Sequence, residues 1–519
     1  MILRFSSLPM LLVAGCAWGA GPYFNVLDYG ARNDASASST EAFRAAIQAA
    51  KAAGGGTVYV PAGNYVTGPI ELVSNLVLSI DAGATLRFPA ARLPFVPGRQ
   101  QGGEALTPVP LVGGRNLENV TLTGRGTLAS DNAEWMRLMP RLAAGGSDPG
   151  SANGPNWERL LRLLEIETPA SPEDYLKAAP ELRPSFVRTM DSRNVLIEGL
   201  HFAGSPMWTI HLLYSDNVPV HGVTIETYPG VHTDGIVVDS SRNVRISDCY
   251  IDTGDDGIVI KSGKDADGMR VNRPSEDIAI DNCTVRHAHG AVTLGSETSG
   301  WIRNLTASNI ACHGTQMGVR IKSSRTRGGG VENVRFSGWV MEDVGQAIDV
   351  TNYYLMEGEV RGGPAPVSPR TPVFRNIAIG DMSISHARAA IEVEGLPEMP
   401  IEGLRLYHIV ASAKAGMKAY NTVALSLDDV QVDADSGPAF LVRDSKALEL
   451  NRVTTRKALA GVPVVRLDGC AGAVVRVGRI PLSTGVGELK SLAIEGNPVV
   501  SESKVNYWTA SEPAKEGAK

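Results

Sequence analysis

One repeated pattern constrains the fold of this chain more than any other feature. From about residue 190, an Asn or Asp repeatedly begins a short run of alternating apolar residues, and Gly, Ser or Asp then interrupts it. Alternation with period 2 is typical of strands that bury one face, and repeats of this size need their neighbours to complete a core. The pattern therefore predicts a coil of short, stacked strands. Its copies begin at Asn194, Asn217, Asn243, Asp277, Asn304, Asn333 and Asn376.

The copy NVRISDCYI illustrates one unit of this coil. Arg245 is expected to face outward, and a bend near Ser247 and Asp248 resets the alternation. Cys283 and Cys312 occupy matching places in two later units, so the cysteines are predicted to stack inside as small apolar groups. The asparagines are predicted to be turn residues with left-handed backbone. The residues expected to point inward are Val244, Ile246, Cys249 and Ile251.

Two segments depart from the repeat. A helix is expected from Thr40, where TEAFRAAIQAAKAAGGG has apolar residues at helical spacing before a glycine stop, and it would cover the N-terminal end of the coil. Residues 130–184 are predicted to form a loop insertion with amphipathic helices in EWMRLMPRL and NWERLLRLLEIE. This insertion is either a surface excursion or a wall that closes one end of a substrate cleft.

Residues 1–20 have the pattern of an export signal, with one early Arg, a short apolar run and then small residues. The order Ala17-Trp18-Gly19 suits an ordinary signal peptidase, whereas the residues before Cys16 resemble a lipoprotein box in which Cys16 is lipidated. Either alternative predicts a secreted, periplasmic or lipid-anchored protein without a transmembrane span. We expect one catalytic coil over residues 21–505 and a polar tail over residues 506–519.

Composition excludes some classes of function. The net charge is −6, and the 49 Lys and Arg are scattered along the chain, which argues against nucleic-acid binding. No CxxC pair suggests a zinc site. We predict no metal and no cofactor.

Polar residues gather on neighbouring coils. Asp255 and Asp256 follow Asp234 by 21 and 22 residues, which is close to one coil, so a parallel coil would place them side by side on one outer face. His289 follows about one coil later, and the next coil carries two basic residues. These residues, Arg320 and Lys322, are two positions apart and share one strand face.

Clustered carboxylates suit acid–base chemistry. Adjacent carboxylates cannot all ionise freely, so one is expected to keep a proton and act as an acid while others act as a base. Cleavage of a glycosidic bond with inversion requires such a pair about 6.5 to 9.5 Å apart. The basic pair would attract an acidic group on the substrate. Taken by itself, an Asp-Asp pair usually belongs to a turn, and a pair of basic residues usually lies on a solvated strand face.

The combined motifs resemble those of one family. The motif series NTD, DD, GHG and RIK is typical of the polygalacturonases of glycoside hydrolase family 28. The segments FNVLDYGARND and GGGTVYVPAGNY are also similar to the N-terminal parts of pectinase β-helices. The resemblance implies an all-β, right-handed parallel β-helix of the pectin lyase-like type. The matching motifs here are HTD at 232–234, DD at 255–256, AHG at 288–290 and RIK at 320–322.

The resemblance also implies roles. Asp255 would be the general acid, Asp234 and Asp256 would activate water, and His289 would support protonation of the acid. The residues implied to bind the substrate carboxylate are Arg320 and Lys322. Two positions depart from the family pattern, because His232 replaces Asn and Ala288 replaces Gly. His232 adds a titratable ring beside Asp234 that either alters substrate binding and pH optimum or is structural.

Further candidates surround these motifs. Trp208 and His211 lie one coil before the first aspartate, where an aromatic ring would either stack on a sugar or pack in the core. Tyr353 and Tyr354 lie one coil beyond the basic pair, near a substrate-binding tyrosine of the family. Glu297, in GSETSG, resembles exo-acting bacterial members, whose extra loops block one end of the cleft.

The sequence therefore predicts an inverting, exo-acting hydrolase, a monomer that removes galacturonic acid from pectic chains. A hydrolase of rhamnogalacturonan or substituted pectin is the first alternative, which the retained His289 disfavours. A β-helix polysaccharide lyase would instead need a calcium carboxylate cage and a basic catalytic residue. A tailspike or adhesin that binds glycans without turnover is the remaining alternative.

Overall fold

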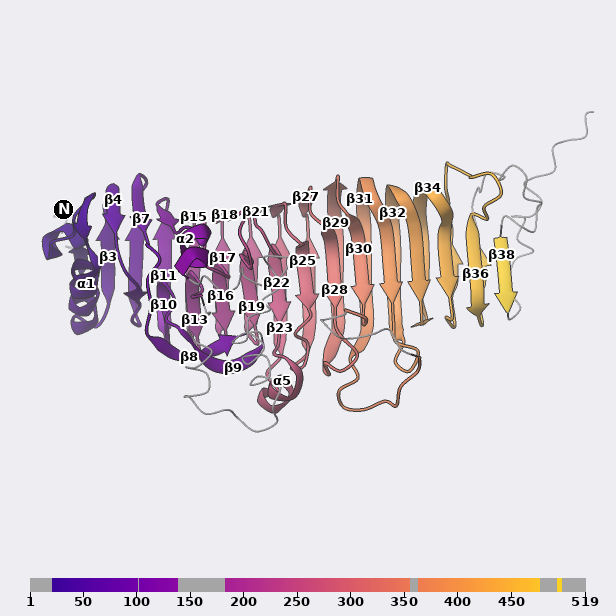
Figure 1. Ribbon diagram of the computed structural model, residues 1–519, viewed down its shortest axis with the longest axis horizontal. Helices are drawn as coiled ribbons and strands as arrows, with labels where there is room; N and C mark the ends of the chain where they lie inside the picture. The colour runs from indigo at the N-terminus through magenta and orange to yellow at the C-terminus, as the bar shows by residue number, and fades with distance from the viewer. Residues whose placement is uncertain (1–20, 101, 139–182, 355–362, 477–491, 497–519) are drawn as a thin grey trace, which may run out of the picture.

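The computed structural model describes residues 21–100, 102–138, 183–354, 363–476 and 492–496. In these residues the chain winds into an elongated solenoid whose coils stack along its long axis (Figure 1). Equivalent strands of successive coils pair in parallel, which gives the right-handed parallel β-helix that the repeat and the resemblance predicted. The predicted boundary at residue 505 and the tail lie outside the described residues.

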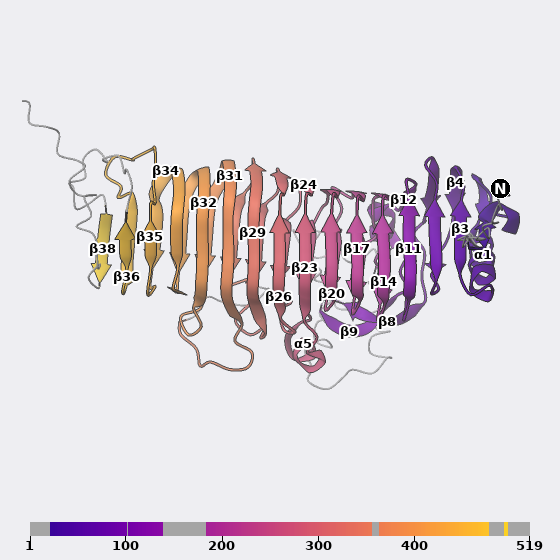
Figure 2. The same ribbon diagram turned by 180° about the vertical axis from the view of Figure 1, so that it is seen from behind.

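Each coil contributes a strand to three ladders. The first ladder consists of β5 (Ile70–Glu71), β10 (Val112–Arg115), β13 (Val187–Met190), β16 (Ile210–Leu213), β19 (Ile236–Asp239), β22 (Ile258–Lys261), β25 (Gly290–Gly295), β28 (Met317–Lys322) and β30 (Gln346–Thr351). The second ladder, seen in Figure 2, consists of β1 (Tyr23–Asn25), β3 (Gly56–Val60), β6 (Leu76–Ile80), β11 (Glu118–Gly124), β14 (Arg193–Glu198), β17 (Asp216–His221), β20 (Arg242–Ser247), β23 (Ser275–Asp281), β26 (Ile302–Ser308) and the first part of β29 (Gly330–Glu342). The third ladder consists of β2 (Asp34–Ser38), β4 (Gly63–Val66), β7 (Ala84–Arg87), β12 (Thr127–Ala129), β15 (His201–Ala203), β18 (Thr224–Glu226), β21 (Tyr250–Asp252), β24 (Thr284–Arg286) and β27 (Ala311–His313).

The C-terminal coils continue these ladders with longer strands that run through the corners. They are β31 (Val373–Glu394), β32 (Ile401–Tyr420), β33 (Thr422–Val423), β34 (Ser426–Arg443), β35 (Glu449–Asn451), β36 (Val465–Cys470), β37 (Val474–Arg476) and β38 (Leu492–Gly496). One antiparallel hairpin, β8 (Phe95–Gln100) with β9 (Gly103–Pro108), departs from the solenoid. The helical elements are η1 (Val26–Tyr29), α1 (Thr40–Ala52), α2 (Asn132–Leu138) and α5 (Asp265–Val271).

The core follows the predicted alternation. Arg245 is exposed while its predicted inward neighbours are buried. Cys249, Cys283 and Cys312 are buried free thiols, which confirms the expected apolar stack. The asparagines that begin the units also behave as expected, with φ between 54° and 60°. We call the stacked side chains the asparagine ladder, which hydrogen-bonds from coil to coil through Asn75, Asn119, Asn194 and Asn217 and again through Asn304, Asn333 and Asn376.

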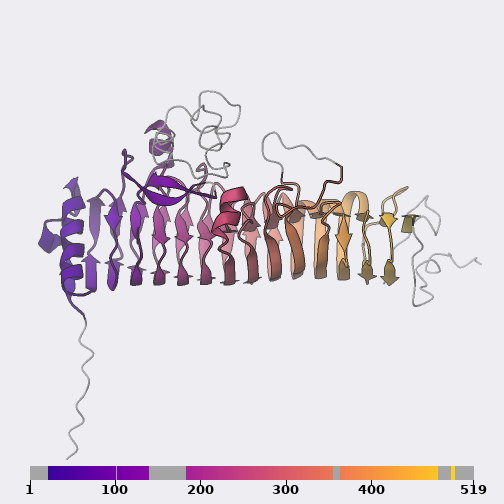
Figure 3. The ribbon, with the colours of Figure 1, turned by 90° about the horizontal axis from the view of Figure 1, so that it is seen from below.

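Helix α1 begins at Thr40 as predicted and lies across the N-terminal end of the coil (Figure 3). Its buried face covers the interior strands with Phe43, Ala46, Ile47 and Ala50. Helix α2 confirms the first predicted helix of the insertion, whereas NWERLLRLLEIE lies outside the described residues. The same is true of the predicted export signal. Within the described residues, no helix has both the length and the apolar character needed to cross a bilayer.

Candidate active site

Three aspartates meet on the outer face of the first ladder. Asp234 precedes β19, and Asp255 and Asp256 precede β22, in the turns that lead from the third ladder to the first. Because β19 and β22 pair in register, the two turns lie side by side. One carboxylate oxygen of each aspartate lies within 4.8 Å of the other two. The coil spacing therefore assembles the cluster that the sequence predicted.

Asp256 is the best neutralised member of the cluster. Lys322 donates from Nζ to its Oδ2 at 3.0 Å, Thr293 donates to its Oδ1 at 2.9 Å, and Arg320 Nη1 lies 3.5 Å away. Burial alone would raise the pKa of Asp256, but the charges of Lys322 and Arg320 outweigh it and lower the pKa. Asp256 is thus held as an anion. Gly290 permits this packing, since a Cβ there would lie 2.2 Å from the Thr293 hydroxyl.

Asp255 is paired with a histidine on the next coil. His289 Nδ1 lies 3.2 Å from Asp255 Oδ1. This hydrogen bond raises the pKa of His289. Burial would raise the pKa of Asp255, but the hydrogen bond and charge of His289 lower it overall. The two shifts favour a positively charged imidazole beside an ionised carboxylate.

The pKa of Asp234 is shifted in the opposite direction from those of Asp255 and Asp256. Burial and the charge of Asp255 raise its pKa well above the usual range. Lys261, buried nearby, opposes this effect, and its Nζ also lies 3.5 Å from Glu297 Oε1.

Sequence reasoning missed Lys261, although a signal for it existed. The segment IVIK ends β22 as VRIK ends β28, and the strand pairing aligns Ile260 with Ile321 through Leu294. Lys261 and Lys322 therefore occupy equivalent places two coils apart on the same outer face. Searching for the IK dipeptide in register would have found it.

The two neighbouring tyrosines differ in their surroundings. The Tyr354 ring lies 5.4 Å from the Arg320 guanidinium and 5.0 Å from Lys322 Nζ, so it borders the basic pair. Tyr353 instead faces Arg325, which also pairs with Glu398. The structure thus brings Tyr354 to the site and directs Tyr353 toward a separate ion pair.

Trp208 and His211 are only 3% and 1% exposed, so neither presents a free ring for a sugar to stack on. Trp208 packs on Val237 and Val259 and faces Lys261, whose Nζ is 5.1 Å from the ring. His211 Nε2 lies 3.4 Å from Asp239. These contacts favour a role in packing, and not in stacking on a sugar, for Trp208 and His211. Glu297 is also buried, as the partner of Lys261.

His232, the first departure from the family motif, lies at the edge of the cluster. Its Nδ1 is 3.4 Å from the guanidinium of Arg183, a buried residue that sequence reasoning missed. Burial lowers the pKa of His232, and the charge of Asp255 opposes that shift. Ala288, the second departure, is fully buried in the core, where its methyl group packs with the coil interior.

The hairpin β8–β9 runs along the lower edge of the first ladder in Figure 1, at the carboxyl-terminal ends of β16 and β19. Arg99 anchors it, donating to Ser240 Oγ at 2.8 Å and to Tyr214 OH at 2.7 Å, and it forms a fully buried ion pair with Asp239. At the hairpin tip, Gly102 accepts from the Lys264 backbone at 2.9 Å. The hairpin forms a wall beside the site.

On the C-terminal side, Asp349 continues the row that contains Arg320. The two residues pair in register on β28 and β30, and Arg320 Nε lies 3.7 Å from Asp349 Oδ2. Burial raises the pKa of Asp349 to about 6. Sequence reasoning missed this acid, because a lone Asp in a strand carries no motif.

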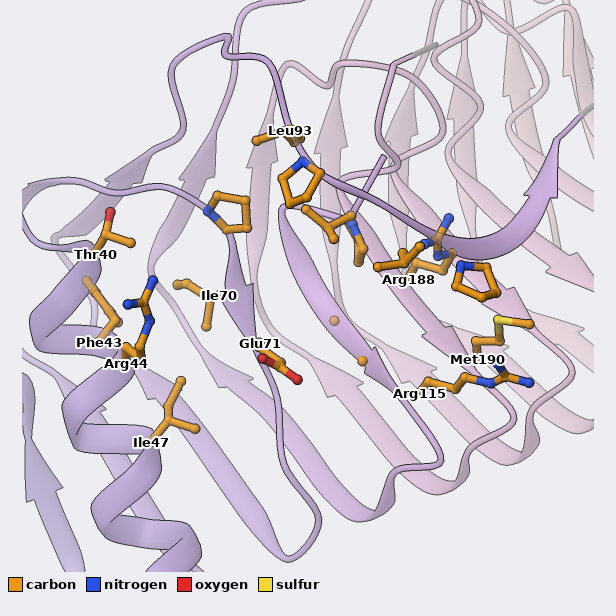
Figure 4. Close-up of a pocket in the computed structure, with 18 of the residues that line it drawn as sticks. Thr40, Phe43, Arg44, Ile47, Ile70, Glu71, Leu93, Arg115, Arg188 and Met190 are labelled. Atoms are coloured by element: carbon orange, nitrogen blue, oxygen red, sulfur yellow. The ribbon is translucent and has the colours of Figure 1, made fainter. Parts of the chain in front are cut away.

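A separate pocket of about 600 Å³ opens on the N-terminal side of the hairpin, between α1 and β5, β10 and β13 (Figure 4). Its walls are mainly aliphatic, with Phe43, Ile47 and Ile70 on one side. None of the predicted site residues lines it. Arg188 marks its boundary with the hairpin, where it donates to Thr107 of β9.

The arrangement can supply a proton, a base and positive charge at one place. One oxygen of each of the three carboxyls lies within 4.8 Å of the others, so the three side chains can contact one small group in common. A cation could be held by the three aspartates. However, Lys322 and Arg320 already neutralise Asp256, so the cluster has little need of a metal ion.

Comparisons with known proteins agree with this geometry. A family profile described as "Glycosyl hydrolases family 28" matches residues 176–396, and one described as "Rhamnogalacturonase A/epimerase, pectate lyase-like" matches residues 23–88. A "probable polygalacturonase" of Vitis vinifera is 29% identical over 408 residues, which cover 75% of each chain. The exo-poly-alpha-D-galacturonosidase of Dickeya chrysanthemi is 28% identical over 72% of this chain and 64% of its own.

The solved structures include a similar enzyme. The hyperthermoactive exopolygalacturonase of Thermotoga maritima superimposes with a TM-score of 0.68 at 32% sequence identity. The match covers 78% of this chain and 92% of that chain.

Proposed function

This chain belongs to glycoside hydrolase family 28 and is therefore a pectin hydrolase of the polygalacturonase type, and we propose that it acts from chain ends to release galacturonic acid. The observation that carries the proposal is the position of hairpin β8–β9, whose tip residue Gly102 accepts from the Lys264 backbone and so borders the coil that carries Asp255 and Asp256 as a wall. A wall there leaves room for a chain end and obstructs a continuous polymer. The exo-acting relatives support the same reading.

In the proposed mechanism, Asp255 protonates the leaving oxygen. The proton comes from the Asp255–His289 pair, in which the imidazolium stores it. Asp256 is the general base, since Lys322 and Arg320 keep it ionised. Asp234 helps to hold the attacking water, and the basic pair with Tyr354 binds the uronate.

We further propose that the anomeric configuration inverts, with the water held jointly by Asp234 and Asp256. Retention is the specific competitor, because retaining enzymes also use two carboxyl groups, one of them as a nucleophile. Proton NMR of the first product formed separates the two. An initial β-anomer from the α-linked substrate supports inversion, and an initial α-anomer contradicts it.

Product sizing after incubation with polygalacturonate and with rhamnogalacturonan tests the substrate and the mode of attack. Monomer alone from polygalacturonate supports the proposal. Random fragments contradict exo attack, and product from rhamnogalacturonan alone favours the related hydrolase. Unsaturated products that absorb ultraviolet light would identify a lyase.

A matched pair of variants tests the wall. Gly102 and Gly437 both have positive φ, so alanine strains the backbone similarly at each. A Cβ at Gly102 would lie 2.4 Å from Lys264 Cβ and 3.0 Å from Glu297 Cγ, whereas Gly437 has open space. We expect Gly102→Ala to displace the tip and yield longer products, and Gly437→Ala to leave product length unchanged. Identical products from both variants would contradict the wall.

We also propose that the protein is exported, on the pattern of residues 1–20. Mass spectrometry of the N-terminus from the producing cell tests this. A start just after Gly19 or Ala20 indicates ordinary cleavage, and a lipidated Cys16 indicates an anchor. An intact N-terminal Met1 in the cytoplasmic fraction would contradict export.

A further inference from the structure

Arg183 connects the edge of the active site to the backbone behind it. Its side chain is buried, and Nη1 donates to the carbonyls of Pro206 at 2.7 Å and Val231 at 2.9 Å. Its Nη2 lies 3.4 Å from Nδ1 of His232. The two carbonyls hold the guanidinium through Nη1, so that an N–H of Nη2 faces the imidazole of His232.

This contact selects one form of His232. A guanidinium only donates hydrogen bonds, so the nitrogen that faces it must accept. Burial lowers the pKa of Arg183 to about 10, which leaves it charged at neutral pH. Nδ1 of His232 therefore carries no proton, and the neutral ring has its proton on Nε2.

The groups around His232 include some that raise its pKa and some that lower it. The negative charge of Asp255 favours a protonated ring, while burial and the positive charges of Arg183, His289 and Lys261 oppose it. The pKa of His232 is lowered as a result. Without Arg183, the charge of Asp255 would meet weaker opposition.

We propose that Arg183 is a positioning residue that keeps His232 neutral with its proton on Nε2, so that His232 donates a hydrogen bond to the sugar beside Asp255. The inference rests on the proposed function for the identity of that sugar. A neutral His232 leaves proton exchange at Asp255 to His289 alone. A charged His232 would stabilise the Asp255 anion and weaken it as a proton donor.

A second residue holds the same turn and provides the control. Asn132 Nδ2 donates to the carbonyl of Pro206 at 3.1 Å and contacts that of Val231, whose N–H donates to Asn132 Oδ1 at 3.2 Å. Asn132 therefore supports the backbone when Arg183 is replaced. Among its hydrogen bonds in the described residues, none reaches His232, so Asn132→Ala loosens the turn without changing which nitrogen carries the proton.

The kinetic test compares kcat and KM across pH for Arg183→Gln, Asn132→Ala, His232→Asn and the Arg183→Gln/His232→Asn double variant. We expect Arg183→Gln to move the acid limb of kcat upward by about one pH unit. The shift should be absent in Asn132→Ala and abolished in the His232→Asn background, because an amide does not titrate. A purely structural Arg183 would instead lower kcat equally in both backgrounds without moving the limb, and that result would overturn the inference.

A spectroscopic test needs no substrate. In protein with isotope-labelled histidines, of which the chain has nine, loss of a signal in His232→Asn assigns His232. We expect a neutral ring protonated on Nε2 with a titration midpoint below 6.5, which rises in Arg183→Gln. Equal midpoints in both proteins would overturn the inference. Failure to hydrolyse polygalacturonate would overturn the proposed function and leave this measurement intact.

Discussion

In the asparagine ladder one side chain recurs from coil to coil, whereas on the outer face of the first ladder the side chain changes along the row. Asn304, Asn333 and Asn376 repeat one hydrogen bond from coil to coil. The aligned row on the first ladder instead reads Arg188, His211, Val237, Val259, Thr293, Arg320 and Asp349. Repetition in register builds a scaffold, and variation in the same register builds a site.

The two regions also differ in how their charges affect stability. The ladder amides are exposed and satisfied by one another, so each contributes modestly to stability. On the catalytic face, Asp234 and Asp349 are buried carboxyls whose pKa values are raised, so ionising them costs folding free energy. Substitutions of these two aspartates should therefore lower activity and raise stability. Substitutions in the asparagine ladder should lower stability and leave activity unchanged.

The largest effect is expected for Asp234→Asn. Loss of a group that holds the attacking water should lower kcat about 10³-fold. A raised pKa means that the stability contributed by the protonated carboxyl is lost as pH rises, and asparagine removes that loss. Urea unfolding at pH 7 should therefore give a higher midpoint than the wild type. If the variant loses both activity and stability, the expected difference between the catalytic face and the asparagine ladder is contradicted.

Asp349→Asn should have the next largest effect. The pKa of Asp349 is raised by burial to about 6 from an unfolded value near 3.8, so its contribution to stability is complete below pH 3.8 and lost as pH rises through about 6. The variant should gain up to about 3 kcal/mol relative to wild type at pH 7.5 and almost nothing at pH 3.5. Urea titrations at both pH values measure it. An equal gain at both would point to packing instead of ionisation.

Arg320→Gln is expected to raise KM for oligogalacturonides about 10- to 100-fold, since a charge-assisted contact to the substrate carboxylate is lost. Lys418 offers a matched control, because it occupies the same register position three coils further along. Lys418→Gln should leave KM unchanged. An equal rise in both variants would mean that the face attracts substrate by general charge and not at one site.

The smallest effect belongs to the ladder. Asn304→Ala removes one exposed hydrogen bond on each side and an amide suited to left-handed backbone, so unfolding should become easier by about 1 kcal/mol. kcat and KM should not change. Calorimetry with activity assays checks both, and altered kinetics would show that the scaffold and the site are coupled.

Sequence could predict what repeats. The alternation in NVRISDCYI was enough for the coil, and the 21-residue step from Asp234 to Asp255 was enough to bring the carboxylates together. The helix at Thr40 was predictable from its own spacing and glycine stop.

Sequence could not predict what the repeat does not encode. Hairpin β8–β9 is held by contacts such as Arg99 to Asp239, whose partners lie 140 residues apart. The contact of Arg183 with His232 also joins residues that are far apart in the sequence, at a separation of 49 positions. The raised pKa of Asp234 depends on burial and on the sum of neighbouring charges, which no motif reveals.

The hairpin wall has a consequence for the size of the product. In a solenoid, successive coils are separated by a fixed rise of about 4.8 Å, so the coil at which the hairpin tip attaches, here through Gly102 and the Lys264 backbone, sets its distance from the carboxylates along the axis. If the wall stops the chain end, this distance acts as a ruler that measures the released piece. Related enzymes could then change product length by attaching such a hairpin one coil earlier or later, without altering the catalytic residues.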